Sequence, residues 1–175
     1  MGTKSRMTDT RMRAYRIVSA LAGAMVVTAA VAVVHDTKQA ATADEGCDVK
    51  VNVALPQRPA QVKLRVSNGT RTAGLAERVS ADFENRGFVT QSPAKSKSKV
   101  DQVAVIEYGP KSVGAAQWIR AFFLGEADAR FSAARTTDVV DVEIGTRYRQ
   151  LATQTEVNQS LAQLGEPVPP PGTCA

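Results

Sequence analysis

Two acidic side chains on one predicted strand are the first candidates for chemistry. Asp141 and Glu143 stand two positions apart within residues 140–144, so both project from one face of an extended chain. Paired carboxylates can act as a general acid and a general base. Their alternation with apolar residues favours a strand whose acidic face is turned to solvent. We therefore expect a solvated face, and an acid–base pair is the alternative.

The run Asn68, Gly69, Thr70 and Arg71 is a second candidate site, because it joins a predicted strand to a predicted helix. Backbone N–H groups at such a junction can bind an anion, helped by the arginine and the helix dipole. Asn-Gly is also an ordinary turn, and a threonine here can cap the helix. These four residues are our candidate binding site, with a simple turn as the alternative.

The sequence contains few side chains that are suited to nucleophilic catalysis or to metal binding. His35 is the single histidine, so the serines and threonines that follow it have no imidazole as a base. A zinc site lacks ligands for the same reason. We predict no catalytic residue, no metal and no cofactor, and hence no enzyme activity. Trp118, Phe122 and Phe123 are expected in the core rather than on a ligand platform.

The location of these residues depends on residues 17–34, eighteen positions without a charge or a proline. As a helix this stretch is about 27 Å long, close to the hydrocarbon thickness of a bilayer. We therefore predict a single transmembrane helix. Five basic residues precede it: Lys4, Arg6, Arg11, Arg13 and Arg16. Because positive charge stays inside, residues 1–16 should be cytoplasmic and the rest extracytoplasmic.

A cleaved signal peptide is the alternative for this segment. Residues 41–43 are Ala-Thr-Ala, which are small side chains of the kind that signal peptidase requires. The apolar stretch is longer than a usual signal-peptide core, however, and charged residues separate it from that site. We favour a retained signal anchor in the cell membrane.

The net charge of +5 invites a nucleic-acid interpretation, but the charge is unevenly distributed. Residues 1–35 carry five basic and one acidic side chain, and residues 36–175 carry seventeen and sixteen. The part predicted to be exported is close to neutral and lacks the footprint of a nucleic-acid binder. We expect no nucleic-acid partner. Lys95, Lys97 and Lys99 are expected in a solvated loop, with contact to an anionic wall polymer or lipid headgroups as the alternative.

Two cysteines, Cys47 and Cys174, lie at the two ends of the predicted exported part. In an oxidising compartment such thiols pair more often than they stay free. A disulfide between them would close a loop of about 128 residues and contribute on the order of 5 kcal/mol as an upper estimate. Two free thiols, or a disulfide between two molecules, are the alternatives.

Periodicity predicts one domain in which strands and helices alternate. Alternating apolar residues predict strands at residues 62–66, 88–92, 103–108 and 140–144, with a weaker strand at 129–134. Apolar spacings of three and four predict helices at residues 73–86, 113–123 and 154–164. Residues 35–61 should form an extracytoplasmic linker, or an added edge strand at 51–55, and residues 149–175 a terminal helix and a proline-rich tail.

This order of elements predicts an α+β fold with one mainly antiparallel sheet and its helices on one face. The two strand-helix-strand units favour a split βαβ arrangement that resembles a ferredoxin-like fold. Residues 62–148 and the helix after them are enough for a single small domain with its own core.

Several short motifs over residues 62–148 resemble the LytR C-terminal domain family. They are Val66-Ser67-Asn68-Gly69-Thr70, Gly74-Leu75-Ala76, Arg86-Gly87-Phe88-Val89, Ile106-Glu107-Tyr108-Gly109 and the run from Val140 to Thr146. The Gly-x-Asp-Phe ending of the family stands here as Gly145-Thr146-Arg147-Tyr148. Arg147 therefore replaces an acid, and no role of that acid carries over.

The resemblance implies a setting in the cell envelope. The domain occurs at the end of LytR-CpsA-Psr proteins, which attach glycopolymers to peptidoglycan, and alone behind one membrane span in actinobacteria. This chain looks like the stand-alone form, similar to an actinobacterial envelope integrity protein. That form implies a non-catalytic, membrane-anchored protein that supports cell-wall integrity by binding a partner protein or a wall polymer. The alternatives are an accessory enzyme or a regulator of lipid-linked glycopolymer attachment to peptidoglycan.

Overall fold

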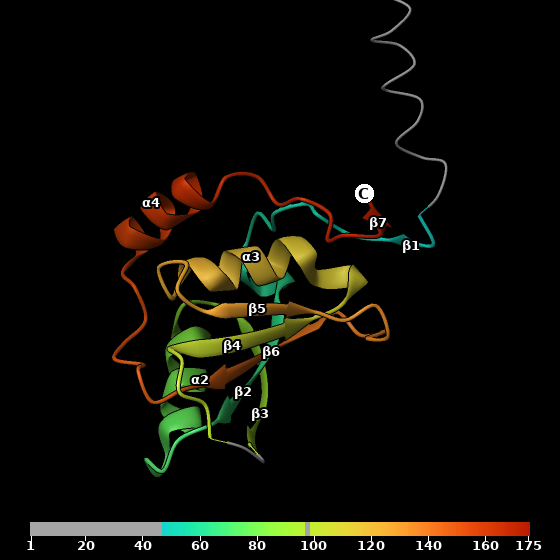
Figure 1. Ribbon diagram of the computed structural model, residues 1–175. Helices are drawn as coiled ribbons and strands as arrows, with labels where there is room; N and C mark the ends of the chain where they lie inside the picture. Colours follow the sequence, from blue (N-terminus) through green and yellow to red (C-terminus); the bar gives the residue numbers. More distant parts are fainter. Residues whose placement is uncertain (1–46, 97–98) are drawn as a thin grey trace, which may run out of the picture. The chain divides into compact units, whose positions relative to one another are not determined.

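The structure is a computed structural model, and it describes residues 47–96 and 99–175 (Figure 1). The predicted cytoplasmic tail, the predicted transmembrane helix at residues 17–34 and the first part of the linker lie outside the described residues. Within residues 47–96 and 99–175, no helix combines the length and the apolar character that crossing a bilayer requires.

One five-stranded sheet forms the centre of the domain (Figure 1). Its strands are β2 (Lys63–Asn68), β3 (Val89–Lys95), β4 (Ala104–Tyr108), β5 (Asp128–Phe131) and β6 (Val139–Ile144). Their order across the sheet is β3-β2-β6-β4-β5. Strand β2 runs parallel to both β3 and β6, and β4 runs parallel to β5, whereas β4 and β6 are antiparallel. The sheet is therefore mixed and mainly parallel.

The mainly antiparallel sheet and the split βαβ order that the sequence predicted are wrong. Helix α2 (Leu75–Asn85) connects β2 to β3, and helix α3 (Val113–Ala121) connects β4 to β5. Each helix carries the chain back to the end of the sheet at which the preceding strand began. The next strand therefore runs parallel to that strand. In both units the two strands are direct neighbours, so no strand splits them. The predicted small domain that combines helices with one sheet is confirmed.

The hydrophobic core lies between the sheet and the two crossover helices. Alternate residues of the inner strands are fully buried in it: Leu64, Val66, Ile106, Val140 and Val142. The ring of Phe83 in α2 meets that of Phe122, just after α3, with centroids 5.5 Å apart and an edge-to-face geometry. The expected core position of Phe122 and Phe123 is confirmed. Trp118 is half-buried, and its ring centroid lies 5.4 Å from that of Phe88.

Helix α4 (Gln154–Leu164) has the bounds that the apolar periodicity predicts. Thr153 precedes it as the N-cap, and its hydroxyl oxygen accepts a hydrogen bond from the Glu156 N–H. The Glu156 carboxylate in turn accepts from the Thr153 N–H at 2.7 Å. This capping box satisfies two donors that a helix start leaves unpaired, and it lowers the pKa of the Glu156 carboxyl. Val157, the next residue of the helix, is buried in the core.

The two ends of the described domain are fastened together. Strand β1 (Val49–Lys50) pairs in parallel with β7 (Thr173–Cys174), and the Cα atoms of Cys47 and Cys174 lie 5.9 Å apart, at disulfide distance. Segment 51–54 then crosses the start of α3, where the Gly114 N–H donates to the Asn52 carbonyl. We call this arrangement the clasp. It contains a shorter strand, at residues 49–50, than the edge strand considered for residues 51–55.

We predict that the clasp carries a disulfide that stabilises the folded domain. The free energy of unfolding of a Cys47→Ser/Cys174→Ser double variant should be about 2–4 kcal/mol lower than that of the oxidised protein, because the unfolded chain loses its cross-link. Denaturant titration of the oxidised and the reduced protein measures the difference. Addition of a reductant should change the wild type and leave the double variant unaltered; an equal response of both proteins would contradict the prediction.

The capping box yields a second stability prediction. Thr153→Ala should lower the free energy of unfolding by about 1 kcal/mol, because the Glu156 N–H loses its side-chain acceptor. Thr155→Ala is the matched control, since Thr155 is an exposed residue of the same first turn and its loss leaves the box intact. Denaturant titration compares the two variants, and equal losses would show that the box has no specific effect.

Candidate functional site

A cavity of about 570 Å³ opens where the β2–α2 loop meets the loop that follows β6. We call it the basic cleft. Its lining residues are Thr70, Arg71, Thr72, Leu75, Arg78, Lys99, Gly145, Thr146, Tyr148 and Arg149. Strands β2 and β6 are parallel neighbours, so their carboxyl ends meet at one edge of the sheet, which is where open sheets containing parallel strands commonly bind ligands. The described residues that line the cavity supply four cations and no carboxylate.

The turn at Asn68 helps to form this cleft, and its own hydrogen bonds are local or reach neighbouring segments. The Asn68 carboxamide oxygen accepts from the Thr70 N–H and the Thr70 hydroxyl at 2.9 and 2.8 Å. The Gly69 N–H donates to the Ile144 carbonyl at 2.9 Å. Helix α2 begins only at Leu75, after an N-cap glycine with φ 69°. The Gly69 and Thr70 N–H groups are thus engaged within the protein, as in an ordinary turn, and the anion site at Asn68, Gly69, Thr70 and Arg71 stays a prediction.

Two glycines allow the loop before β4 to cross the strand ends at close range. The Val100 N–H donates to the Gly69 carbonyl at 2.9 Å, and the Thr146 N–H donates to the Val100 carbonyl at 2.8 Å. A Cβ on Gly69 would lie 2.7 Å from a methyl of Val100, and one on Gly145 would overlap the Gln102 carbonyl. This crossing brings Lys99 to the rim of the basic cleft.

Three of the four cations at the cleft have no described counter-ion. Arg71, Arg78 and Arg149 are exposed, and none of them forms an ion pair with a carboxylate of the described residues. Lys99 differs, because its ammonium lies 2.7 Å from the Asp101 carboxylate and lowers the pKa of that group. A concave surface lined by uncompensated charge of one sign attracts ligands of the opposite sign. The cleft therefore favours an anion.

Tyr148 adds a neutral phenol to the lining of the basic cleft. Its side chain is half-buried, and burial raises the pKa of the phenol to about 12, with repulsion from the Asp82 carboxylate adding to the shift. The cations of Arg86 and Arg78 act in the opposite direction. The phenol thus keeps its proton at physiological pH and can donate a hydrogen bond to an anion.

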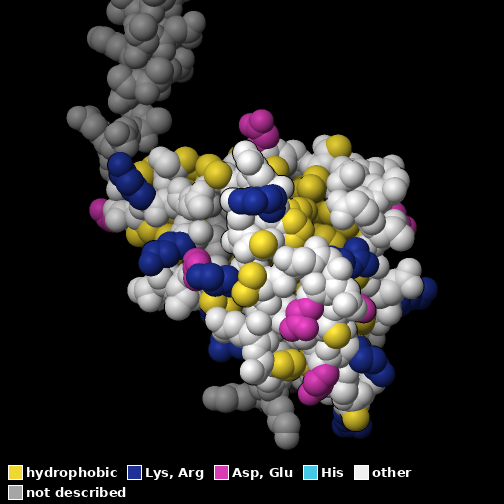
Figure 2. Space-filling view, turned by 180° about the vertical axis from the view of Figure 1, so that it is seen from behind, with side chains coloured by type: hydrophobic (Ala, Val, Ile, Leu, Met, Phe, Trp, Pro, Cys, Tyr) yellow, Lys and Arg dark blue, Asp and Glu magenta, His cyan; other side chains and the backbone are white. Residues whose placement is uncertain are grey.

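A second and larger cavity of about 940 Å³ adjoins the basic cleft and shares Thr146, Tyr148 and Arg149 with it. We call it the adjoining groove. Its other lining residues are Val103, Phe122, Phe123, Leu124, Glu126, Arg147 and Gln150. Apolar and aromatic side chains from the end of α3 thus stand beside a basic site. Figure 2 shows that apolar side chains gather in a hollow on one face of the domain, whereas Lys and Arg are spread more widely there.

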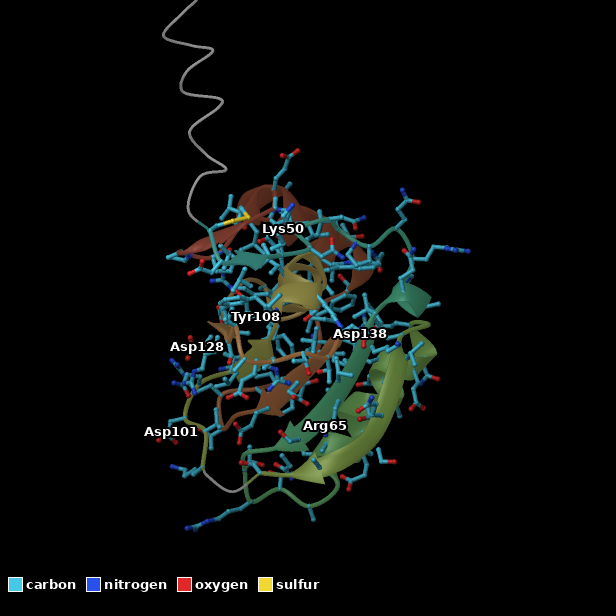
Figure 3. The ribbon with its side chains drawn as sticks, turned by 90° about the vertical axis from the view of Figure 1, so that its right-hand side faces the viewer. Lys50, Arg65, Asp101, Tyr108, Asp128 and Asp138 are labelled. Carbon is cyan, nitrogen blue, oxygen red and sulfur yellow. A yellow bond between two sulfur atoms is a disulfide. The ribbon has the colours of Figure 1, made fainter. Side chains whose placement is uncertain are left out.

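Asp141 and Glu143 lie elsewhere, and neither lines the basic cleft or the adjoining groove. The Asp141 carboxylate forms ion pairs with Arg65, at 2.7 Å, and with Arg135, and only 18% of its side chain is exposed. Arg65 is labelled in Figure 3. Glu143 accepts a hydrogen bond from the Ser96 hydroxyl. The expectation of a solvated acidic face is wrong for Asp141, which arginines cover from two sides.

Sequence reasoning found Thr70 and Arg71 but missed most of the cleft. Arg78 and Arg149 had no motif to mark them, and Lys99 was expected in a solvated loop. The sequence offers two weak signals for these residues. Arg78 lies near the start of the predicted helix at residues 73–86, and Arg149 directly follows the Gly-Thr-x-Tyr motif. In residues 47–96 and 99–175, no three Asp, Glu, His or Cys side chains gather closely enough to hold a metal ion.

Comparisons with known proteins agree with the architecture. Residues 61–148 match the model of a family described as LytR cell envelope-related transcriptional attenuator. The fold is similar to the crystal structure of the soluble domain of a conserved hypothetical secreted protein from Mycobacterium marinum, with a TM-score of 0.51 and 23% sequence identity. That similarity covers 63% of this chain and 73% of the other, and at this identity it concerns the fold alone. No curated protein matches the chain.

The Tyr148 phenol yields a prediction on pH dependence. Its pKa rises from 10.0 in the unfolded chain to about 12 in the folded domain, so the folded state holds more protons between these values. The free energy of unfolding should therefore fall as the pH rises above 10, and Tyr148→Phe should reduce this fall. Tyrosinate absorbance and denaturant titration at several pH values measure both effects. Ionisation of Tyr148 near pH 10 in the native protein would contradict the prediction.

Proposed function

The chain belongs to the LytR cell envelope-related transcriptional attenuator family, and on this premise we propose that it is a non-catalytic, membrane-anchored protein that supports cell-wall integrity by binding an anionic wall polymer. The basic cleft is the binding site of this proposal. Every residue that lines it except Arg149 lies within the part of the chain that matches the family.

One observation carries the proposal: Arg71, Arg78 and Arg149 surround a single cavity without a described carboxylate partner. Guanidinium groups bind phosphate and carboxylate through paired, charge-assisted hydrogen bonds. Thr72 and Tyr148 add hydroxyl groups to the same wall. Such a set of donors suits the repeated phosphate or carboxylate groups of a wall polymer better than it suits a neutral sugar.

The proposed topology places this cleft at the outer surface of the membrane. Residues 17–34 would span the bilayer, with residues 1–16 in the cytoplasm. Of the predicted linker at residues 35–61, the part ahead of Cys47 would then connect the span to the domain, because residues 47–54 belong to the clasp. The disulfide between Cys47 and Cys174 would form in that oxidising environment. In this arrangement the domain acts as a tether between the membrane and the wall.

An accessory enzyme is less well supported, because the acids considered for catalysis are not available for it. Asp141 is held by Arg65 and Arg135, and Glu143 by Ser96. Both lie outside the cavity that collects the cations. A regulator of polymer attachment is compatible with the cleft, yet no contact among the described residues favours it over a tether.

A charge-removing variant tests the proposal. Arg71→Gln/Arg149→Gln should weaken binding of the full chain to a phosphate-containing wall glycopolymer at least about 10-fold, because charge-assisted hydrogen bonds contribute roughly 1.5–3 kcal/mol each. Binding of the wild type should also weaken as salt rises. Calorimetric titration with purified polymer, on protein held in neutral-lipid nanodiscs, measures both changes.

Arg58→Gln is the matched control, because Arg58 is exposed and lines neither the basic cleft nor the adjoining groove. The proposal requires that this control bind polymer as the wild type does. If the control and the double variant lose affinity for the polymer equally, the loss would reflect only a general effect of positive charge. If the wild type does not bind polymer but captures an envelope protein, the ligand of this proposal would be a protein partner and not a polymer.

A further inference from the structure

We propose that a cavity at the opposite edge of the sheet from the basic cleft binds a small monocarboxylate that carries an aromatic group. This cavity has a volume of about 380 Å³, and its walls come from β4, α3, β5 and residues 168–171 of the proline-rich tail. We call it the tail cavity. It shares no lining residue with the basic cleft or the adjoining groove, so the inference does not depend on the proposed function.

The tail cavity lies where two parallel strands end. Tyr108 (Figure 3) and Phe131 are the last residues of β4 and β5, and they stand opposite each other in the parallel register. Because β4 is antiparallel to β6, these carboxyl ends lie at the other edge of the sheet from the end of β6. The carboxyl ends of parallel strands are the common ligand-binding position in open sheets, and the tail cavity has this position.

Two aromatic side chains provide the apolar surface of the tail cavity. The rings of Tyr108 and Phe131 lie with their centroids 5.8 Å apart and their planes at 56°. Both residues are half-buried, so a ligand can still reach their rings. Asp128 and Arg130 alternate with Phe131 along β5 and therefore project from the other face of the strand, where they form an ion pair at 2.8 Å. Among the described residues that line the cavity, none carries a carboxylate.

Arg120 brings a positive charge to this apolar surface. Its Nε–H donates to the Gly125 and Ala127 carbonyls, at 3.0 and 3.2 Å, which holds the half-buried side chain at the end of α3. Its two amino groups form no hydrogen bond or ion pair with any described residue. A guanidinium presents paired donors that match the two oxygens of a carboxylate. A single cation without a described counter-ion therefore favours one carboxylate.

Tyr108 adds a neutral hydrogen-bond donor to the same cavity. Burial raises the pKa of its phenol above the ordinary value of 10.0, and the Arg120 cation acts in the opposite direction. The phenol thus keeps its proton at physiological pH and can donate a hydrogen bond to a carboxylate. One cation, one phenol and two rings suit an aromatic monocarboxylate better than a phosphate, which carries more charge.

The proline-rich tail forms the roof of the tail cavity. From residue 164 to residue 173 every third residue is half-buried and those between are exposed, which is the period of a polyproline II helix. The roof is fastened at both ends, where the Gln117 carboxamide donates to the Gly165 carbonyl at 2.6 Å and β7 pairs with β1. Residues 166–169 form no hydrogen bond with another described residue. The roof can therefore lift and admit a ligand without the loss of a hydrogen bond.

Photolabelling of the full chain in phosphatidylcholine nanodiscs tests the inference. The probes are para-benzoylbenzoate, a photoreactive aromatic carboxylate, and its uncharged analogue para-benzoylbenzyl alcohol. The carboxylate should label residues 113–120, 129–131 or 168–171 at a concentration about 10-fold lower than the alcohol, because charge-assisted hydrogen bonds to Arg120 add binding free energy. Peptide mass spectrometry identifies the labelled residues, and naphthoate should compete with the carboxylate probe.

Arg120→Gln is the diagnostic variant. It should weaken labelling by the carboxylate about 10-fold, to the level of the alcohol, and leave labelling by the alcohol unchanged. Arg130→Gln is the matched control, because Arg130 lies on β5 outside the cavity, and it should change neither. Phe131→Leu keeps the charge and removes a ring, so it should weaken labelling by both probes about 5-fold.

The outcomes separate this site from the basic cleft. Equal labelling of the tail cavity by the two probes would overturn the role of Arg120 and the carboxylate. Carboxylate labelling confined to residues 146–150, and lost in Arg71→Gln/Arg149→Gln, would assign the carboxylate to the basic cleft and overturn the inference. Absence of labelling at the tail cavity by either probe would overturn it as well. Polymer binding should be unaltered by Arg120→Gln, so each of these results leaves the proposed function standing.

Discussion

The pairing of β6 with β2 on one side and β4 on the other is the interaction on which the rest of the structure depends. Each βαβ unit contributes only two strands, and β6 joins them into one sheet over a common core. The buried residues of β6, including Val140 and Val142, contact this core from the middle of the sheet. Because β6 ends beside β2, the same pairing also creates the edge at which the basic cleft opens.

Local pattern was enough to locate the elements but not to order them. The apolar periodicity placed α4 at its observed bounds and marked β2, β4 and β6 to within a residue or two. Such periodicity specifies which face of a strand is buried, and it holds no information on which strand lies alongside or in which direction. The parallel pairing of β2 with β6 joins residues 63–68 to residues 139–144, a relation that only the packed core determines.

The candidate site was harder to predict for a related reason. The cleft takes its cations from three separate stretches of chain, with Arg71 and Arg78 in the first, Lys99 in the second and Arg149 in the third. The near-neutral composition of residues 36–175 hides their convergence. The prediction of a solvated Asp141 was wrong for the same reason, because its partner Arg65 is 76 positions away in the sequence. The Asn68 turn was recognisable because the hydrogen bonds of the Asn68 side chain are local.

The clasp determines how the domain would carry mechanical load. A pull on the chain ahead of Cys47 reaches the domain by two routes, through segment 51–54 into the start of α3 and, across the sulfur pair, through the proline-rich tail into α4. Tension is thereby shared between two helices that pack against each other. The hydrogen bonds between segment 51–54 and the start of α3 come before β2 along the chain, so they take the load before it reaches the strands that frame the basic cleft.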